Sequence, residues 1–186
     1  GFTPSVENRS HVARNAGIRH CTRPLLAFTD DDVEVDVHWT AETVDAFARD
    51  PGADAVCGIV VPAVLNTEAQ RFFQFDLGGF GSRYVPVRFD RRFLDANLAV
   101  GPQVWRIGAG ANMAFRREVF DRVGHFDERL GAGASGCSED SELWYRIIAA
   151  GGACLYEPRV MVRHHHRADW PGLCQQLRAY MKGHTA

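Results

Sequence analysis

The segment Pro24–Val33, which reads PLLAFTDDDV, decides how this chain folds. The mostly apolar residues 25–29 predict a short buried strand, and three consecutive aspartates follow it directly. In open α/β sheets, ligands bind where loops leave the carboxyl ends of the strands. Because side chains alternate along extended backbone, we expect Asp30 and Asp32 on one side and Asp31 on the other. The segment therefore predicts a strand that delivers two carboxylates to a site.

Two carboxylates held close together call for a cation. Two unit charges about 4 Å apart repel by roughly 4 kcal/mol at an effective dielectric constant of about 20. Beside an anionic substrate the repulsion grows, and oxygen ligands suit Mg²⁺ or Mn²⁺. The alternative is a solvated loop in which one aspartate caps a helix. The triplet alone does not decide between these two interpretations.

Composition bounds the class of protein. The 186 residues are 46% hydrophobic, which suits one globular domain with a sizeable core. With 21 basic against 23 acidic residues, no net field attracts nucleic acid. The five cysteines are widely spaced and lack a CxxC pair, which argues against a disulfide scaffold and favours a reducing, cytoplasmic setting. No apolar run reaches the roughly 20 residues of a membrane span. The chain does not start with Met, so we expect it to be part of a longer protein.

Hydrophobic periodicity and helix stop signals predict alternating strands and helices. Helices are expected at 10–18, 39–49, 116–123, 138–150 and 171–182, and strands at 25–29, 55–61, 153–156 and 160–163. Ser138 is expected to cap the helix after it, in which Glu142 pairs with Arg146 one turn later. This alternation predicts an α/β sandwich with a mainly parallel central sheet. The stretch 66–102, rich in aromatic residues and arginine, is left unassigned.

Three further segments carry residue types that bind ligands. RIGAGANMAFRR (106–117) is a turn of small residues that leads through Asn112 into a helix, and such turns let backbone approach a ligand. GHFDERLGAGASGCSED (124–140) is a glycine loop that ends in the acidic pair Glu139 and Asp140. PRVMVRHHHR (158–167) ends a strand in histidines, of which His164 and His166 share a side and offer a neutral imidazole to a metal. Taken singly, each segment also fits a structural role, such as a carboxylate favoured by a helix dipole.

Taken in this order, the segments resemble those of the inverting family 2 glycosyltransferases of the GT-A fold. The similarity runs through ARNAGI (13–18), AFTDDDV (27–33), GAGANMAFRR (108–117), GHFDERLGAG (124–133), SEDSELWYRI (138–147) and YEPRVMVRHHHR (156–167). It implies that residues 1–186 form a single GT-A catalytic domain that lacks the first strand and helix, which carry the nucleotide-base pocket in the family. A fragment of that kind is expected to be poorly stable and to bind nucleotide weakly.

The resemblance also implies a reaction and its residues. Family members transfer a sugar from a nucleotide-diphosphate sugar to a hydroxyl acceptor, such as a glycan, a lipid-linked sugar or a small molecule. The metal, Mn²⁺ or Mg²⁺, is assigned to Asp30, Asp32 and His164, with His166 as the second choice for the histidine. Asp140 is implied as the catalytic base, with Glu139 as its neighbour. Contacts to donor and acceptor are implied for Arg14, Asn15, Asp30, Asp31, Gly110 and Asn112.

Other functions stay open at the level of sequence. Clustered aspartates with a histidine also suit a metal-dependent nucleotidyltransferase or phosphohydrolase, and a catalytically inactive sugar-binding fragment would keep the fold. The segment 175–179 lacks the Trp that ends the QxxRW motif of processive synthases, which favours single-sugar transfer. The cysteine pattern favours the cytoplasm, and peripheral association with the inner face of the membrane stays open. The stretch 66–102 either contacts the acceptor or a membrane surface, or forms a satellite core.

Overall fold

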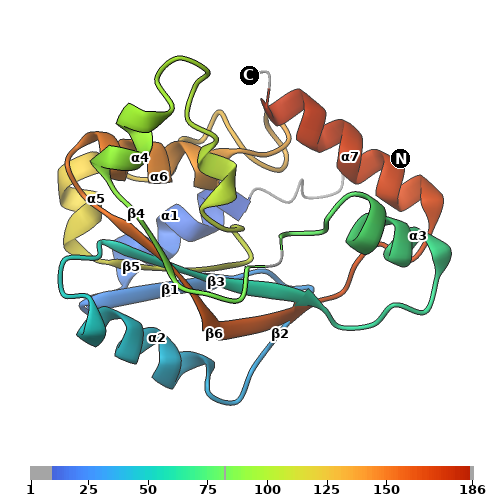
Figure 1. Cartoon of the computed structure of the whole chain (residues 1–186), viewed down its shortest axis with the longest axis horizontal. Coiled ribbons are helices and arrows are strands. Elements are labelled where there is room, and N and C mark those ends of the chain that lie inside the picture. The colour runs from blue at the N-terminus through green and yellow to red at the C-terminus, as the bar shows by residue number, and fades with distance from the viewer. Residues whose placement is uncertain (1–9, 82, 185–186) are drawn as a thin grey trace, which may run out of the picture.

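The computed structural model describes residues 10–81 and 83–184, and within them six strands form one sheet. Its order is β1-β5-β3-β6-β2, with β4 paired to β6 outside that path. The strands are β1 Leu25–Thr29, β2 Val33–Val35, β3 Ala55–Pro62, β4 Val87–Phe89, β5 Asn112–Arg116 and β6 Cys154–His164. Figure 1 shows α2 (Trp39–Arg49) below the sheet, whereas α1 (Ser10–His20), α5 (Glu118–Val123) and α6 (Glu139–Ala149) lie above it.

The α/β class is confirmed, but the strand directions differ from the expected mainly parallel sheet. Among the described pairs only β3 and β6 run parallel. Strand β5 is antiparallel to both β1 and β3, and β6 is antiparallel to both β2 and β4. Parallel neighbours need a long crossover, usually a helix, whereas β4 and β5 enter the sheet from loops and short turns. Their direction is therefore set by their partners in the sheet.

Strand β5 is also the element that the sequence pattern misplaced. The segment NMAFR, expected to lead from a turn into a helix, forms this strand, and α5 begins only at Glu118. Its side chains Met113, Ala114 and Phe115 are buried because both faces of the strand are covered. Continuous apolar sequence of this kind carries no period that distinguishes strand from helix.

Most other elements match their predicted positions. Strand β1 and helix α2 have the predicted bounds. In α6 the predicted ion pair is present, with Arg146 Nε 2.6 Å from Glu142 Oε1. Ser138 does precede α6, but its φ of 82° is left-handed and its side chain makes no capping hydrogen bond. The two strands predicted at 153–156 and 160–163 are one strand, β6, whose pairing with β3 shifts register after Gly58.

The core lies on both faces of the sheet. Above it, α6 buries Leu143, Trp144, Ile147 and Ile148 completely, and below it Ala46 and Phe47 of α2 pack on β3, β5 and β6. Full burial of one large apolar side chain contributes about 1.5–3 kcal/mol. This two-sided packing fixes the edge of the sheet at which the site described below is built.

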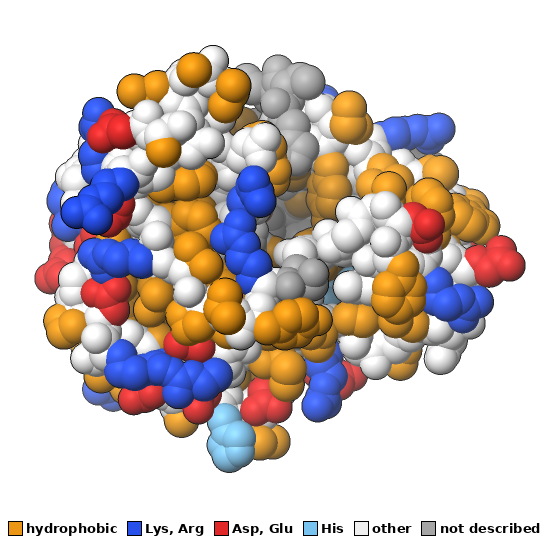
Figure 2. Space-filling model, viewed as in Figure 1, with side chains coloured by type: hydrophobic (Ala, Val, Ile, Leu, Met, Phe, Trp, Pro, Cys, Tyr) orange, Lys and Arg blue, Asp and Glu red, His pale blue; other side chains and the backbone are white. Residues whose placement is uncertain are grey.

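The stretch left unassigned contains short elements. These are α3 (Glu68–Arg71), the π-helix η1 (Phe72–Asp76), β4 and α4 (Arg91–Ala96), and the 3-10 turn η2 (Val104–Arg106) follows just after the stretch. Part of it is a satellite core, since Ala69 and Phe73 pack on Leu173 of the last helix, α7 (Trp170–His184). Tyr84, Val85 and several other hydrophobic side chains of this stretch stay exposed. Figure 2 shows hydrophobic side chains intermixed with basic ones on the face of the molecule in view.

The remaining expectations concern cysteines and the membrane. All five cysteines are free thiols, as the sequence predicted. Within residues 10–81 and 83–184, no helix combines the length and the apolar character that crossing a membrane requires.

Candidate active site

Strand register brings the predicted residues to one edge of the sheet. Thr29, the last residue of β1, pairs with Asn112, the first residue of β5. Val33, the first residue of β2, pairs with His164, the last residue of β6. The aspartates between β1 and β2, the glycine turn before β5 and the histidines after β6 therefore meet at this edge. Helix α6 begins nearby and adds the acidic pair.

A cavity of about 1310 Å³ opens there. Its walls include eight of the residues implied by the resemblance, namely Arg14, Asp30, Asp31, Asp32, Gly110, Glu139, Asp140 and His164. Small-molecule sites usually measure about 300–1000 Å³, so the cavity is large enough for more than one ligand. The structure thus confirms that these distant segments share one space.

Arg14 joins three of these segments. Its guanidinium donates to Glu139 Oε1 at 2.7 Å, to Asp30 Oδ1 at 2.7 Å and to the carbonyl of Gly110 at 3.3 Å. Only 8% of the side chain is exposed. Burial by itself would lower the pKa of Arg14, but the charges of Asp30 and Glu139 raise it above its ordinary value. Removing one member of such a buried group typically costs about 3–5 kcal/mol, so Arg14 holds α1, β1 and α6 in register at the site.

Asp140 is the carboxylate with the altered acidity. Burial and then the neighbouring charge of Glu139 raise its pKa to about 6, against the lowering effect of Arg14. Its Oδ1 accepts from the backbone amide of Ser141 at 2.7 Å, and the amide of Gly110 also donates to the carboxylate. A side chain at Gly110 would crowd it, because a Cβ there would lie 3.1 Å from Asp140 Oδ2. Asp140 is thus held on the cavity wall with a pKa suited to proton transfer near neutral pH.

Asp32 and His164 form a second polar group on the cavity wall. His164 Nε2 lies 3.4 Å from Asp32 Oδ1, and a guanidinium nitrogen of Arg167 lies 3.4 Å from Asp32 Oδ2. Burial lowers the pKa of His164, and Asp32 opposes that shift. A neutral imidazole nitrogen and a carboxylate oxygen at this separation fit a divalent cation.

The third predicted metal ligand is engaged elsewhere. Asp30 is paired with Arg14, and in the described part of the chain no three His, Cys, Asp or Glu side chains surround one point in the manner of a metal site. Asp32 and His164 fit as two ligands from the protein, and the Oδ1 atom of Asp30 is taken by Arg14. The assignment of all three to one ion stays a prediction.

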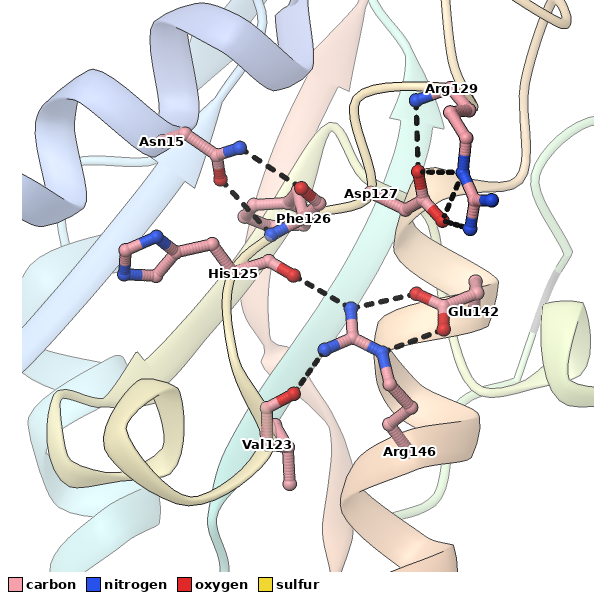
Figure 3. A network of polar contacts seen from close by, with 8 residues as sticks. All are labelled: Asn15, Val123, His125, Phe126, Asp127, Arg129, Glu142 and Arg146. Atoms are coloured by element: carbon pink, nitrogen blue, oxygen red, sulfur yellow. Dashed lines mark hydrogen bonds and ion pairs between the residues drawn. The ribbon is translucent and has the colours of Figure 1, made fainter.

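Two implied contact residues lie away from the cavity. Asn112 is completely buried and bridges the core: its amide donates to the carbonyls of Ile59 and Val160 at 2.9 and 2.8 Å and accepts from the Trp39 indole at 2.9 Å. Asn15 makes a two-way hydrogen bond with the backbone of Phe126, at 2.9 and 3.0 Å (Figure 3). Both amides satisfy backbone groups that would otherwise be buried without a partner, so their role is structural.

The loop that leads to the acidic pair is anchored by helix α6. Arg146 donates to the carbonyls of His125, at 2.7 Å, and Val123, while it also pairs with Glu142 (Figure 3). Further along, Gly131 has a φ of 89°, and a Cβ there would lie 2.9 Å from the carboxylate of Glu139. A glycine at this position therefore lets the loop pass directly behind the acidic pair.

The sequence interpretation missed the wall formed by α7. Gln175, Gln176 and Tyr180 of this helix line the cavity, and Gln176 donates to the Tyr180 hydroxyl at 2.8 Å. The spacing of four residues between the two polar side chains on one helix was a signal for this wall. Arg167 was also missed, although it directly follows the histidine run.

The chain is similar in sequence to a known family and to several curated proteins. The family described as "Glycosyltransferase like family 2" matches residues 3–183. The pre-mycofactocin glycosyltransferase of Mycobacterium tuberculosis is 30% identical over 164 residues, which cover 86% of this chain and 31% of that relative. The glucosyl-dolichyl phosphate glucuronosyltransferase of Haloferax volcanii is 30% identical over 126 residues, 67% of this chain and 37% of that relative. The chain thus spans about a third of the length of these curated relatives.

The structure is similar to that of a solved glycosyltransferase. The mannosyltransferase PcManGT from Pyrobaculum calidifontis, in complex with GDP-Man and Mn²⁺, matches with a TM-score of 0.53 at 19% identity. The match covers 92% of this chain and 43% of that one. It confirms the predicted GT-A fold.

Proposed function

This chain belongs to the glycosyltransferase-like family 2, and on that premise we propose that it transfers a sugar from a nucleotide-diphosphate sugar to an acceptor hydroxyl. The transfer depends on Mn²⁺ or Mg²⁺ and inverts the anomeric carbon. One observation carries the proposal: Asp140, with a pKa of about 6, lines the same cavity as Asp32 and His164. A base and a cation site in one cavity are the two parts that such a transfer needs.

The donor is expected at the Asp32 side of the cavity. Asp32 and His164 would hold the metal, which when bound neutralises charge on the diphosphate. Arg167, beside Asp32, adds a second positive group at the same wall. The solved mannosyltransferase with GDP-Man and Mn²⁺ supports this choice of donor class and metal.

The acceptor hydroxyl is expected next to Asp140. The Asp140 carboxylate takes the hydroxyl proton, and the acceptor oxygen forms a bond to the anomeric carbon. The bond from that carbon to the diphosphate oxygen breaks, and its electron pair leaves with the nucleoside diphosphate. A single displacement of this kind inverts the carbon. Glu139 is held in an ion pair with Arg14, whose guanidinium lies 2.7 Å from Glu139 Oε1, so Asp140 is the member of the acidic pair that exchanges the proton.

The proposal is tested by following products in the presence of Mn²⁺ with a panel of nucleotide sugars and hydroxyl acceptors. We expect acceptor-dependent release of nucleoside diphosphate and an inverted product by proton NMR. Release of nucleoside monophosphate or pyrophosphate would instead indicate a phosphohydrolase or nucleotidyltransferase. Asp140→Asn should lower turnover by about 10²–10⁴-fold and retain Mn²⁺-dependent nucleotide binding. Asp121→Asn, at an exposed position of α5 outside the cavity, is the matched control, and near-wild-type turnover of Asp140→Asn would reject the role of that residue.

A further inference from the structure

Four side chains form a continuous polar line that ends at the cavity wall. Gln74 Oε1 lies 3.1 Å from His166 Nε2, and His166 Nδ1 lies 3.0 Å from His164 Nδ1. His164 Nε2 in turn lies 3.4 Å from Asp32 Oδ1. Both ring nitrogens of His166 are therefore engaged, one by an amide and one by another imidazole. His166, considered from the sequence as a second choice of metal ligand, has no ring nitrogen left for that role.

With the carbonyl oxygen of Gln74 turned toward His166, hydrogen-bond chemistry assigns the protons along the line. A carbonyl oxygen only accepts, so Gln74 Oε1 requires the proton of His166 on Nε2. His166 Nδ1 then carries a lone pair and accepts from His164 Nδ1–H. A neutral His164 with its proton on Nδ1 has a lone pair on Nε2, the atom that faces Asp32. A lone pair and a carboxylate facing each other repel, and a cation between them removes the repulsion.

The surroundings hold this line in place. Only 5% of His164 and 4% of His166 is exposed, and the rings of Phe80 and Phe73 pack edge-on against them with centroids 4.8 and 4.9 Å away. Gln70 donates from Nε2 to the backbone carbonyl of His166 at 3.2 Å. The imidazoles are therefore confined by aromatic rings and by their own backbone contacts.

Gln74 lies on an irregular helix. It lies in the π-helix η1, a form that is rare and is often found at functional sites. Gly79 leaves room for its amide, because a Cβ at Gly79 would lie 2.5 Å from Gln74 Oε1 and 3.0 Å from its carbonyl carbon. Gly79 also has a φ of 55°, which a side chain would strain. The irregular helix and Gly79 together allow the Gln74 carbonyl oxygen to accept a hydrogen bond from His166.

We infer that His166 and Gln74 are positioning residues: they hold His164 in the tautomer that presents an unprotonated Nε2 beside Asp32 before any cation is bound. The inference rests on the proposed function, because it assigns His164 as a metal ligand. Partners that fix a ligating histidine through its other nitrogen typically change metal affinity by about 10–100-fold when they are removed.

The first test reads the tautomers directly in the metal-free protein. Two-dimensional ¹⁵N–¹H spectra of protein labelled at histidine distinguish protonated from bare ring nitrogens, and single substitutions assign the signals. We expect His164 protonated on Nδ1 and His166 protonated on Nε2. A proton on His164 Nε2 in the metal-free protein would overturn the inference and leave the proposed transfer reaction untouched.

The second test measures Mn²⁺ affinity by electron paramagnetic resonance. His166→Phe keeps an aromatic ring but removes the acceptor, and it should weaken Mn²⁺ binding at least about 10-fold. His166→Gln, which offers a carbonyl oxygen to His164 Nδ1–H, should recover most of the affinity. His165→Gln is the control, because His165 is exposed and contacts Glu34 outside the cavity.

Two outcomes separate this inference from the proposed function. If the wild-type protein binds no Mn²⁺, the metal-dependent transfer is rejected together with the role of His164. If it binds Mn²⁺ and His166→Phe binds equally well, only the positioning role is rejected. Gly79→Ala displaces Gln74 and leaves both histidines in place, and it should also weaken Mn²⁺ binding. This variant tests the positioning role if His166→Phe does not fold.

Discussion

Replacing Asp140 with asparagine should stabilise the fold at high pH while it slows transfer by about 10²–10⁴-fold. The pKa of Asp140 is 3.8 in an ordinary environment and about 6 in the folded protein, first because of burial and second because of Glu139. The folded state therefore holds this proton more tightly than the unfolded state does. By linkage, the stability that comes from the protonated carboxyl is fully present below pH 3.8 and is lost as the pH rises through about 6. Asparagine stays neutral and has no such loss.

The magnitude follows from the size of the shift. A change from 3.8 to about 6 is about two pKa units, which corresponds to about 3 kcal/mol. Asparagine can keep its oxygen toward the amide of Ser141, but its NH₂ group then faces the amide of Gly110, and one hydrogen bond worth about 1 kcal/mol is lost. We expect Asp140→Asn to be about 2 kcal/mol more stable than wild type at pH 8 and roughly half a kcal/mol less stable at pH 4, where wild type has already lost part of this stabilisation.

Urea denaturation of both proteins between pH 4 and pH 8 provides the measurement. The difference in the free energy of unfolding should change sign across this range and shift by roughly 2–3 kcal/mol in favour of the variant. The surface control Asp121→Asn should show a much smaller trend. A difference that stays constant, or that shrinks as the pH rises, would refute a raised pKa at Asp140 and with it the proton-transfer role.

Three further predictions concern the reaction and the core. The rate of transfer should rise with pH around a midpoint of about 6, set by Asp140, and a profile that is flat between pH 5 and pH 7 would count against it. Arg14→Met removes a charge that lowers the pKa of Asp140, so this midpoint should move to higher pH in the same assay, and an unmoved midpoint would argue against their coupling. Asn112→Leu leaves the carbonyls of Ile59 and Val160 without their donor, and urea denaturation should show a loss of about 2–4 kcal/mol; wild-type stability would show that these hydrogen bonds matter little.

The parts of the fold that could be predicted are those encoded by local pattern. Strand β1 with its aspartates, the amphipathic helix α2 and the Glu142–Arg146 pair all depend on residues within a few positions of one another. Strand β5 could not be predicted in this way. Helix α6 covers one of its faces and helix α2 the other, and burial of both faces removes the alternation by which strands are recognised.

The candidate site shows the same division. The sequence predicted that the Asp30 segment, Glu139 and His164 converge, and the cavity confirms it. It could not predict that Arg14 pairs with Asp30 and Glu139, which are 16 and 125 residues away. The contacts from Gln74 through His166 to His164 could not be predicted either. They depend on a π-helix and on two imidazoles that meet at the end of β6.

The central claim is that a divalent cation, a nucleoside diphosphate and Asp140 share this cavity. Anomalous diffraction at the manganese edge, from crystals grown with Mn²⁺ and a nucleoside diphosphate, tests it most directly. We predict a manganese peak bonded to the Asp32 carboxylate and to His164 Nε2, with the diphosphate between it and Asp140. A manganese peak away from Asp32 and His164, or a nucleotide bound outside the cavity, would contradict the claim.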